Sequence, residues 1–125
     1  MHIVCRIDKE IYKCVTEDIR TDEVIITNER IEHIIERRGK DFYDTYSSQF
    51  ANILKDPDYI FMDKQNTALV SKYFNKDGKS VNIVLRIAVS SDHPDFKNSI
   101  LTAIMENPKR FQQRLRNNSP LYKKE

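Results

Sequence analysis

Four side chains of this sequence are best suited to chemistry: His33, Arg38, Arg86 and Thr102. The first two fall on or just after a segment with helical spacing, and the other two fall in segments with strand periodicity. Histidine titrates near neutral pH and can accept or donate a proton, and a guanidinium group can hold two phosphate oxygens. RNA cleavage without a metal, in which the 2′-hydroxyl attacks the adjacent phosphate, needs a base, an acid and cations for the charged phosphorane. The four side chains together meet that need.

Each of these residues also has an ordinary structural explanation. His33 can lie at the solvent edge of a helix, and Arg38 can complement the negative C-terminal end of that helix. Arg86 can pair with an acidic side chain across a sheet, and threonine is a common strand residue. Signatures of other enzyme classes are missing, because the sequence has no glycine-rich phosphate loop, nucleophile elbow, two-histidine metal helix or dinucleotide fingerprint.

Two helices are expected before the middle of the chain. The first begins at Thr27 or Asn28, either of which can cap it, and ends at Gly39. The second covers residues 41–55 and ends before Pro57. Isoleucines at helical spacing predict the buried face of the first helix, with a polar stripe beside it: Ile31, Ile34 and Ile35, flanked by Arg30, His33 and Arg37.

Strand periodicity marks most of the remaining segments. Two short β-prone runs separated by Asp8, Lys9 and Glu10 predict an opening hairpin, and Asp77-Gly78 predicts a later one. A short, basic helix is expected over residues 108–115. The predicted strands cover residues 2–7, 11–15, 24–26, 59–62, 67–74, 80–90 and 99–105. The sequence therefore predicts one α+β domain, with helices followed by an antiparallel sheet.

The charge of the chain is divided between its halves. Residues 1–63 contain 9 Lys+Arg and 14 Asp+Glu, a net charge of −5, and residues 64–125 contain 12 and 5, a net charge of +7, in agreement with the total of +2. A basic surface of this size suits a polyanion such as nucleic acid, although it equally suits ordinary solvated charge. The acidic half contains the expected helices, and the basic half contains most of the sheet.

The ends and cysteines of the sequence give expectations about its surroundings. No apolar run has the length of a membrane span and the start lacks a signal-peptide layout, so a cytoplasmic site and no membrane partner are expected. Cys5 and Cys14 could form a disulfide, but two reduced thiols suit that compartment better. Three scattered histidines and two cysteines do not supply a zinc site, so neither a metal nor another cofactor is expected.

Six segments occur in the order found in a known family: ITNERIEHIIERRG, DPDYI, NTALVSKYF, SVNIVLRIAVS, NSILTAI and LYKK. Over residues 24–124 the sequence resembles the phage-type barnase–EndoU–colicin–RelE-like (PBECR/BECR) nucleases, with residues 1–23 less recognisable. The resemblance implies that residues 1–125 are a single nuclease domain with a barnase/RelE-like fold. Its helices would pack on an antiparallel sheet of about four strands, with an RNase site on the concave face.

The resemblance also implies roles for particular residues. His33 corresponds to the family's helix histidine, Arg86 to its sheet arginine and Thr102 to its strand hydroxyl. Arg38 stands where family members often have a second histidine. Either Arg38 stabilises charge while His33 serves both proton transfers, or another group such as Tyr122 is the acid, or activity has been lost. Candidates for contacts with phosphate or base are Lys72, Ser99 and Tyr122.

Two functions from different classes follow from these residues. The first is a metal-independent endoribonuclease that cleaves RNA by 2′-hydroxyl attack, either as a toxin or as a phage-encoded processing enzyme. A toxin would need a cognate inhibitor or antitoxin protein as a partner, in addition to RNA. The second is a non-catalytic RNA-binding or protein-interaction module on the same fold, because Arg38 keeps phosphate affinity without proton transfer. A small-molecule enzyme ranks last, because the sequence carries no motif for one.

Overall fold

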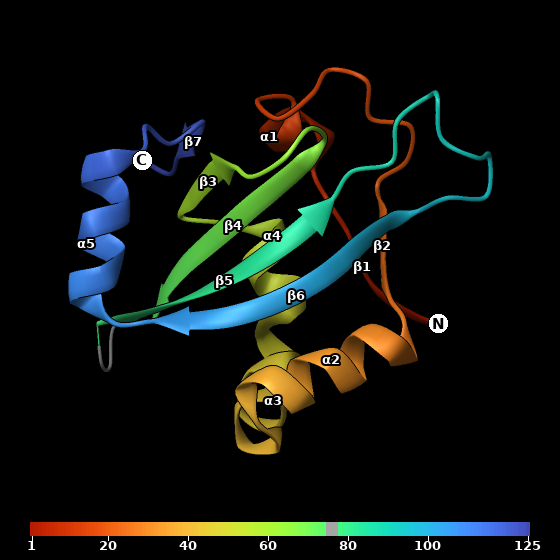
Figure 1. The fold of residues 1–125 in the computed structure, drawn as a ribbon. Helices are drawn as coiled ribbons and strands as arrows, with labels where there is room; N and C mark the ends of the chain where they lie inside the picture. The colour runs from red at the N-terminus through yellow and green to blue at the C-terminus, as the bar shows by residue number, and fades with distance from the viewer. Residues whose placement is uncertain (75–77) are drawn as a thin grey trace.

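The computed structural model describes residues 1–74 and 78–125, and their strands form one seven-stranded sheet (Figure 1). The strands are β1 (His2–Arg6), β2 (Glu23–Ile26), β3 (Tyr59–Met62), β4 (Thr67–Phe74), β5 (Lys79–Arg86), β6 (Asn98–Glu106) and β7 (Tyr122–Lys123). The helices are α1 (Lys9–Tyr12), α2 (Asn28–Arg38), α3 (Lys40–Tyr46), α4 (Phe50–Lys55) and α5 (Pro108–Asn117), with a 3-10 turn η1 (Ser47–Gln49).

The sheet has the strand order β1-β2-β6-β5-β4-β3-β7. All neighbouring strands are antiparallel except β2 and β6, which are parallel. The α+β class is confirmed, but the described sheet is wider than the expected four or so strands. The additional strands lie at its edges, where β2 pairs with Asn98 and Ser99 and β7 pairs with β3. Such pairings between distant or very short segments leave little local pattern in a sequence.

The predicted opening hairpin is wrong. β1 forms as expected, but it pairs with β2, and the segment predicted as its hairpin partner begins at the end of α1 and continues as a turn. Asp8 caps this helix, because its side chain accepts a hydrogen bond from the amide of Glu10 at 2.9 Å. Tyr12 is fully buried and donates its hydroxyl hydrogen to the Leu54 carbonyl at 2.7 Å. The polar residues interpreted as a turn are therefore the start of a helix.

The first predicted helix is confirmed as α2. Thr27 caps it by accepting a hydrogen bond from the Arg30 amide at 3.2 Å, and Gly39 follows it with a φ of 96°, a region that favours glycine. Ile34 is fully buried, whereas Ile31 packs on the core only in part. The spacing of apolar residues thus placed the inner face of this helix correctly.

The second predicted helix is broken into α3, η1 and α4. The break falls at Ser47 and Ser48, whose short hydroxyl side chains support helix poorly. After the break, Phe50, Ile53 and Leu54 of α4 enter the core, whereas none of the α3 residues is fully buried. α4 packs on β1, β4 and β5, whereas α3 packs mainly on α2.

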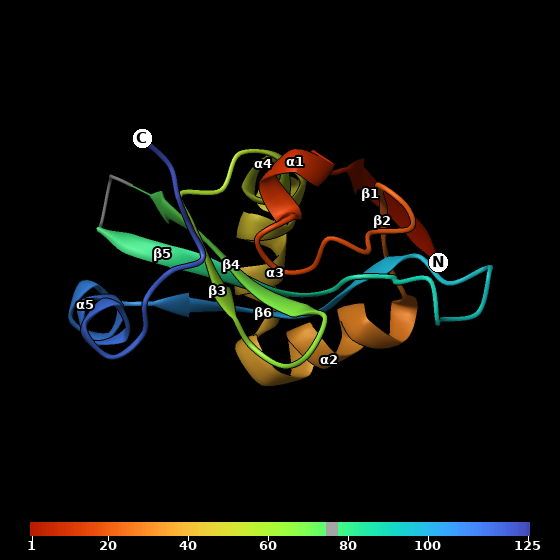
Figure 2. The same ribbon diagram turned by 90° about the horizontal axis from the view of Figure 1, so that it is seen from above.

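The two faces of the sheet are covered by different helices. Figure 2 shows α1 and α4 on one side of the central strands and α5 on the other. On the first side, Val81, Ile83 and Leu85 of β5 join α4 and Ile34 in the main core, and we call this side the core face. On the second side, Phe111 of α5 packs in a smaller cluster, and its principal partners are Tyr59, Phe61, Leu69 and Tyr73.

The later predicted elements are largely confirmed. β5 begins as expected but ends at Arg86, and the chain beyond it turns where the Ile87 amide bonds the Asn66 carbonyl at 2.8 Å. The antiparallel pair β4–β5 forms, although Asp77 of the predicted turn lies outside the described residues. Asn107 caps α5 by accepting from the Arg110 amide at 2.8 Å. In the described ranges, no helix is long and apolar enough to span a membrane.

Candidate functional site

The second side of the sheet carries the concentrated polar side chains, and we call it the polar face. Residues directly opposite on paired strands share a face, so the register of β4, β5 and β6 defines it. Arg86 is opposite Thr67 and Ser99, Val84 is opposite Thr102, and Ser80 is opposite Glu106. The polar members of this face are Thr67, Ser71, Ser80, Asn82, Arg86, Ser99, Thr102 and Glu106.

Three of the predicted site residues lie together on the polar face. Arg86 and Ser99 are direct cross-strand neighbours, and Thr102 follows on the same face after a register shift in the β5–β6 pairing between Val84 and Leu85. A bulge of this kind places an extra residue on one strand and redirects the side chains beside it. The structure therefore brings Arg86, Ser99 and Thr102 onto one surface.

Arg38 lies beside this surface. β2 covers the outer edge of β6 only at Asn98 and Ser99, and α2 packs along β6. Arg38, at the end of α2, donates from Nε to the Ala103 carbonyl oxygen at 3.1 Å. Ala103 directly follows Thr102 in the chain, so this hydrogen bond holds the Arg38 side chain near that part of β6. Its terminal nitrogens make no hydrogen bond with the residues that the structure describes, so its charge stays available.

His33 lies five residues earlier on α2, about one and a half turns, and is half-buried. In the described part of the chain it makes neither a hydrogen bond nor an ion pair. It neighbours Ile34, whose side chain points into the core, and is therefore at the margin of the buried face, as its stripe predicts. The structure shows His33 on the helix that borders β6, and no hydrogen bond joins it to Arg86 or Thr102.

Lys72 and Tyr122 lie on the other side of the sheet. Lys72 is opposite Val81 and Tyr122 is opposite Ile60, and both partners belong to the core face. The Lys72 ammonium donates to the backbone oxygen of Asp56 at 2.7 Å and pairs with its carboxylate at 3.2 Å. Hydrogen bonds from Lys124 and Lys72 hold the pKa of Asp56 below its usual value. The structure does not bring Lys72 or Tyr122 together with the polar-face residues, and their roles stay predictions.

The guanidinium group of Arg86 is held by the loop after β5. It pairs with Asp92 at 3.0 Å, donates to the Ile87 carbonyl and lies over the ring of Phe96, 5.4 Å from the centroid. The Val89 amide is the leading cause that lowers the pKa of Asp92, and Arg86 adds to it, so this carboxylate is ionised. Arg86 is therefore fixed in orientation at the polar face, with its charge shared with Asp92.

Four buried side-chain oxygens on the polar face lack a hydrogen-bond partner among the described residues. They are Ser71 Oγ, Ser80 Oγ, Asn82 Oδ1 and Thr102 Oγ1. A buried polar atom without a partner costs about 1–3 kcal/mol of stability. Such atoms are rare in folded proteins, and each calls for an explanation such as a bound water, an ion or a role in catalysis. Ser71, Ser80 and Asn82 are 0–1% exposed, whereas Thr102 is half-buried, so Thr102 marks the part of this face that a ligand can approach as the candidate site.

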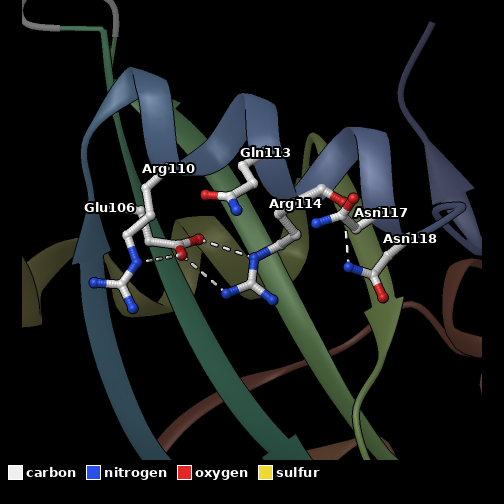
Figure 3. A pocket seen from close by; sticks show the side chains of 6 residues that line it. All are labelled: Glu106, Arg110, Gln113, Arg114, Asn117 and Asn118. Atoms are coloured by element: carbon white, nitrogen blue, oxygen red, sulfur yellow. Dashed lines mark hydrogen bonds and ion pairs between the residues drawn. The ribbon is translucent and has the colours of Figure 1, made fainter.

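An additional charged group at the end of this face was not predicted. The carboxylate of Glu106, which is 3% exposed, accepts two hydrogen bonds from Arg114 at 3.0 and 2.9 Å and one from the Asn82 amide, and Arg110 lies 3.9 Å away (Figure 3). Burial alone would raise the pKa of Glu106, but these partners outweigh it and lower the pKa. Glu106 ends β6 whereas Arg110 and Arg114 belong to α5, so no spacing within one element signalled this cluster in the sequence.

Comparison with known families identifies the chain. Residues 5–123 match the family described as phage-Barnase-EndoU-ColicinE5/D-RelE like nuclease 2, and the chain belongs to this family. The match includes most of the first 23 residues, which resembled the family less clearly. No curated protein and no solved structure matches the chain. Membership in a nuclease family makes nucleic acid the class of substrate.

Side chains that could coordinate a metal ion are not clustered in the part of the chain that the structure describes. In residues 1–74 and 78–125, no group of three or more His, Cys, Asp or Glu side chains is placed to hold one. Cys5 and Cys14 are free and half-buried, and burial raises the pKa of the Cys5 thiol to about 11. Neither cysteine belongs to the polar face.

Proposed function

We propose that this chain is an endoribonuclease that cleaves RNA by attack of the substrate's 2′-hydroxyl, without a metal ion. The observation that carries the proposal is the meeting of Arg86, Ser99 and Thr102 on the polar face, with Arg38 beside Thr102 at its edge. Two guanidinium groups and hydroxyl donors around one surface suit the stabilisation of a charged phosphorane. Family membership adds that the substrate is a nucleic acid.

The proposed roles follow from the surroundings of each group. The Thr102 hydroxyl has no partner within the described protein and so has a hydrogen to donate to a phosphate oxygen, although this buried atom must become accessible before the two can meet. The terminal nitrogens of Arg38 can bind a second oxygen, and Arg86 supplies a guanidinium group that Asp92 holds in place. His33 is the proton-transfer group on the helix that borders β6. Because Tyr122 lies on the core face, we favour His33 as both base and acid, with Arg38 stabilising charge.

The direct test is incubation of the purified protein with total RNA in EDTA. Cleavage should occur, His33→Ala should abolish it, and His93→Ala should leave it unchanged, because the His93 side chain is 74% exposed in a loop and has no proposed role. Products with 2′,3′-cyclic phosphate ends identify attack by the 2′-hydroxyl. Intact RNA across several substrates, or cleavage only without EDTA, would contradict the proposal.

A second function is favoured by Arg38 itself. This arginine stands at the position where the family resemblance implies a histidine, and its Nε is committed to the Ala103 carbonyl. A cation there keeps phosphate affinity but transfers no proton, which suits a non-catalytic RNA-binding module. Salt-dependent RNA binding without turnover would favour this function over the nuclease.

The cellular role can be tested by comparing the wild type with His33→Ala in cells. We propose that the active enzyme acts on RNA in the cytoplasm, either as a toxin or in phage RNA processing. Inducible expression in a bacterial host should arrest growth and degrade RNA for the toxin, with His33→Ala harmless. A toxin would also require a cognate inhibitor protein as its partner. Normal growth with active enzyme in vitro would favour the processing role.

A further inference from the structure

An open hollow of about 190 Å³ lies on the exposed side of α5, at the end of the polar face (Figure 3). We propose that it is a second nucleotide-binding subsite, which takes a backbone phosphate and the base edge of single-stranded RNA more than one nucleotide from the cleaved bond. The inference rests on the proposed function and extends it to substrate length. The lining residues are Glu106, Arg110, Gln113, Arg114, Asn117 and Asn118.

Two guanidinium groups in the hollow have donors to spare. Arg114 uses Nε and Nη2 on Glu106, and Arg110 approaches the same carboxylate only through Nε. The terminal nitrogens of Arg110 and Nη1 of Arg114 make no hydrogen bond with the described residues. Two arginines and one carboxylate leave a net positive charge, and Arg110 is 70% exposed. This is the chemistry of a phosphate contact, because paired guanidinium donors fit phosphate oxygens.

Amide side chains complete the lining of the hollow. Those of Gln113 and Asn117 form no hydrogen bond within the described part of the chain, and Asn118 uses only Nδ2, on the Arg114 carbonyl at 3.2 Å. Each amide offers a donor and an acceptor side by side, which is the pattern that pairs with the edge of a base. A site for phosphate alone would need no such groups. The combination favours a nucleotide over a simple anion.

The position of the hollow connects it to the proposed catalytic surface. Glu106 ends β6 and lies on the polar face with Thr102, four residues earlier on that strand. At the rise of a strand, four residues span about 13 Å. An RNA strand lying along β6 could therefore contact both places. Glu106 is a positioning residue here, because it holds Arg114 and stays buried beneath the hollow.

The test measures binding of 2′-O-methyl RNA, which cannot undergo 2′-hydroxyl attack, by fluorescence anisotropy. Arg110→Gln should weaken binding of a single-stranded decamer about tenfold, since a charge-assisted hydrogen bond contributes about 1.5 kcal/mol. The slope of log Kd against log salt concentration should become shallower by about the amount expected for one phosphate contact. Gln113→Ala should weaken decamer binding without that change in salt dependence. Binding of a dinucleotide should be the same for all variants.

Arg116→Gln is the matched control, because it removes the same charge from an exposed position of α5 outside the hollow. Its effect on decamer binding should stay below about twofold, as expected for a diffuse surface charge. Equal effects of Arg110→Gln and Arg116→Gln would overturn the subsite. So would unchanged decamer affinity in Arg110→Gln, or Arg110-dependent binding of poly-glutamate without RNA binding. Normal decamer binding by a chain that fails to cleave would reject the nuclease but keep the subsite.

Discussion

Among the described residues, the core side and the polar face of the sheet differ in whether all of their buried polar side chains find hydrogen-bond partners. On the core side, the buried Tyr12 hydroxyl reaches the Leu54 carbonyl, and Lys72 reaches Asp56. On the polar face, the four buried oxygens without a partner in the described protein occur beside a buried carboxylate. The helices on the two sides differ as well, with α4 on the main core and α5 on the smaller cluster, while α2 packs along the edge strand β6 and contributes Ile34 to the main core.

The difference indicates a division of labour between stability and binding. Apolar burial on the core face supplies most of the free energy of folding. Unpaired polar atoms on the other face lower stability, and such local violations are expected at functional sites. If this division is correct, substitutions on the two faces should change stability and activity in separate ways. Neighbouring residues of β5 provide the sharpest test, because their side chains alternate between the faces.

The largest effect on stability is expected for Ile83→Ala. Ile83 is fully buried in the main core, and its truncation should lower the free energy of unfolding by about 2–5 kcal/mol. Val84→Ala, one residue along and on the half-buried polar face, should cost about 1 kcal/mol. Chemical denaturation of both variants measures the difference. Equal losses would show that the two faces share one core and would remove the basis of the comparison.

Much of the fold was predictable from local pattern. Thr27 and Gly39 marked the ends of α2, and the alternation of Val81, Ile83 and Leu85 identified the core face of β5. The errors arose where a tertiary contact overrode a local preference. Residues 11–15 contain β-prone side chains, but capping by Asp8 and burial of Tyr12 favour a helix over residues 9–12, which is followed by a turn. Edge pairings of β1, β2 and β7 depend on segments far apart in the chain.

The candidate site was predictable only in part. Periodicity placed Arg86 opposite the core face of its strand, and the structure confirms that position. It could not place Lys72, because face assignment across several strands depends on register, and Lys72 is opposite Val81 of the core face. Glu106 was missed because a single acidic residue in a basic segment carries little signal. Its importance comes from burial and from Arg114, which only the packing of α5 on the sheet reveals.

A second prediction concerns the ion pair beneath α5. Because its folded pKa lies below the usual 4.5, Glu106 binds a proton less readily in the folded chain than in the unfolded one. Its contribution to stability is therefore fully present above pH 4.5 and is lost as the pH falls through the lowered folded value. Glu106→Gln should lower the free energy of unfolding at pH 7 by about 1–3 kcal/mol.

The pH series for Glu106→Gln has a built-in control. Asp56 and Asp92 also have lowered pKa values, so the wild type and the variant should both lose stability in acid. Only the difference in the free energy of unfolding between wild type and variant reports the contribution of Glu106, and this difference should become smaller below pH 4.5. Denaturation curves at several pH values measure it. A difference that stays constant down to pH 3 would mean that the carboxylate charge does not hold Arg114, and that the hollow on α5 is formed by packing alone.

The smallest effect on stability, and the most telling one, is expected for Thr102→Val. Valine has nearly the shape of threonine and lacks the buried hydroxyl that has no partner in the described structure. Removal of this atom should leave the free energy of unfolding unchanged or raise it by about 1 kcal/mol. RNA cleavage should nevertheless fall, because the hydroxyl is the proposed donor to the phosphate.

Thr67→Val is the control for Thr102→Val, since the Thr67 hydroxyl already donates to the Gln65 carbonyl at 3.1 Å. Its loss should destabilise the chain without the same loss of cleavage. A stabilised Thr102→Val variant with full activity would show that the unpaired hydroxyl serves neither folding nor catalysis, and the polar face would then lose its central functional residue.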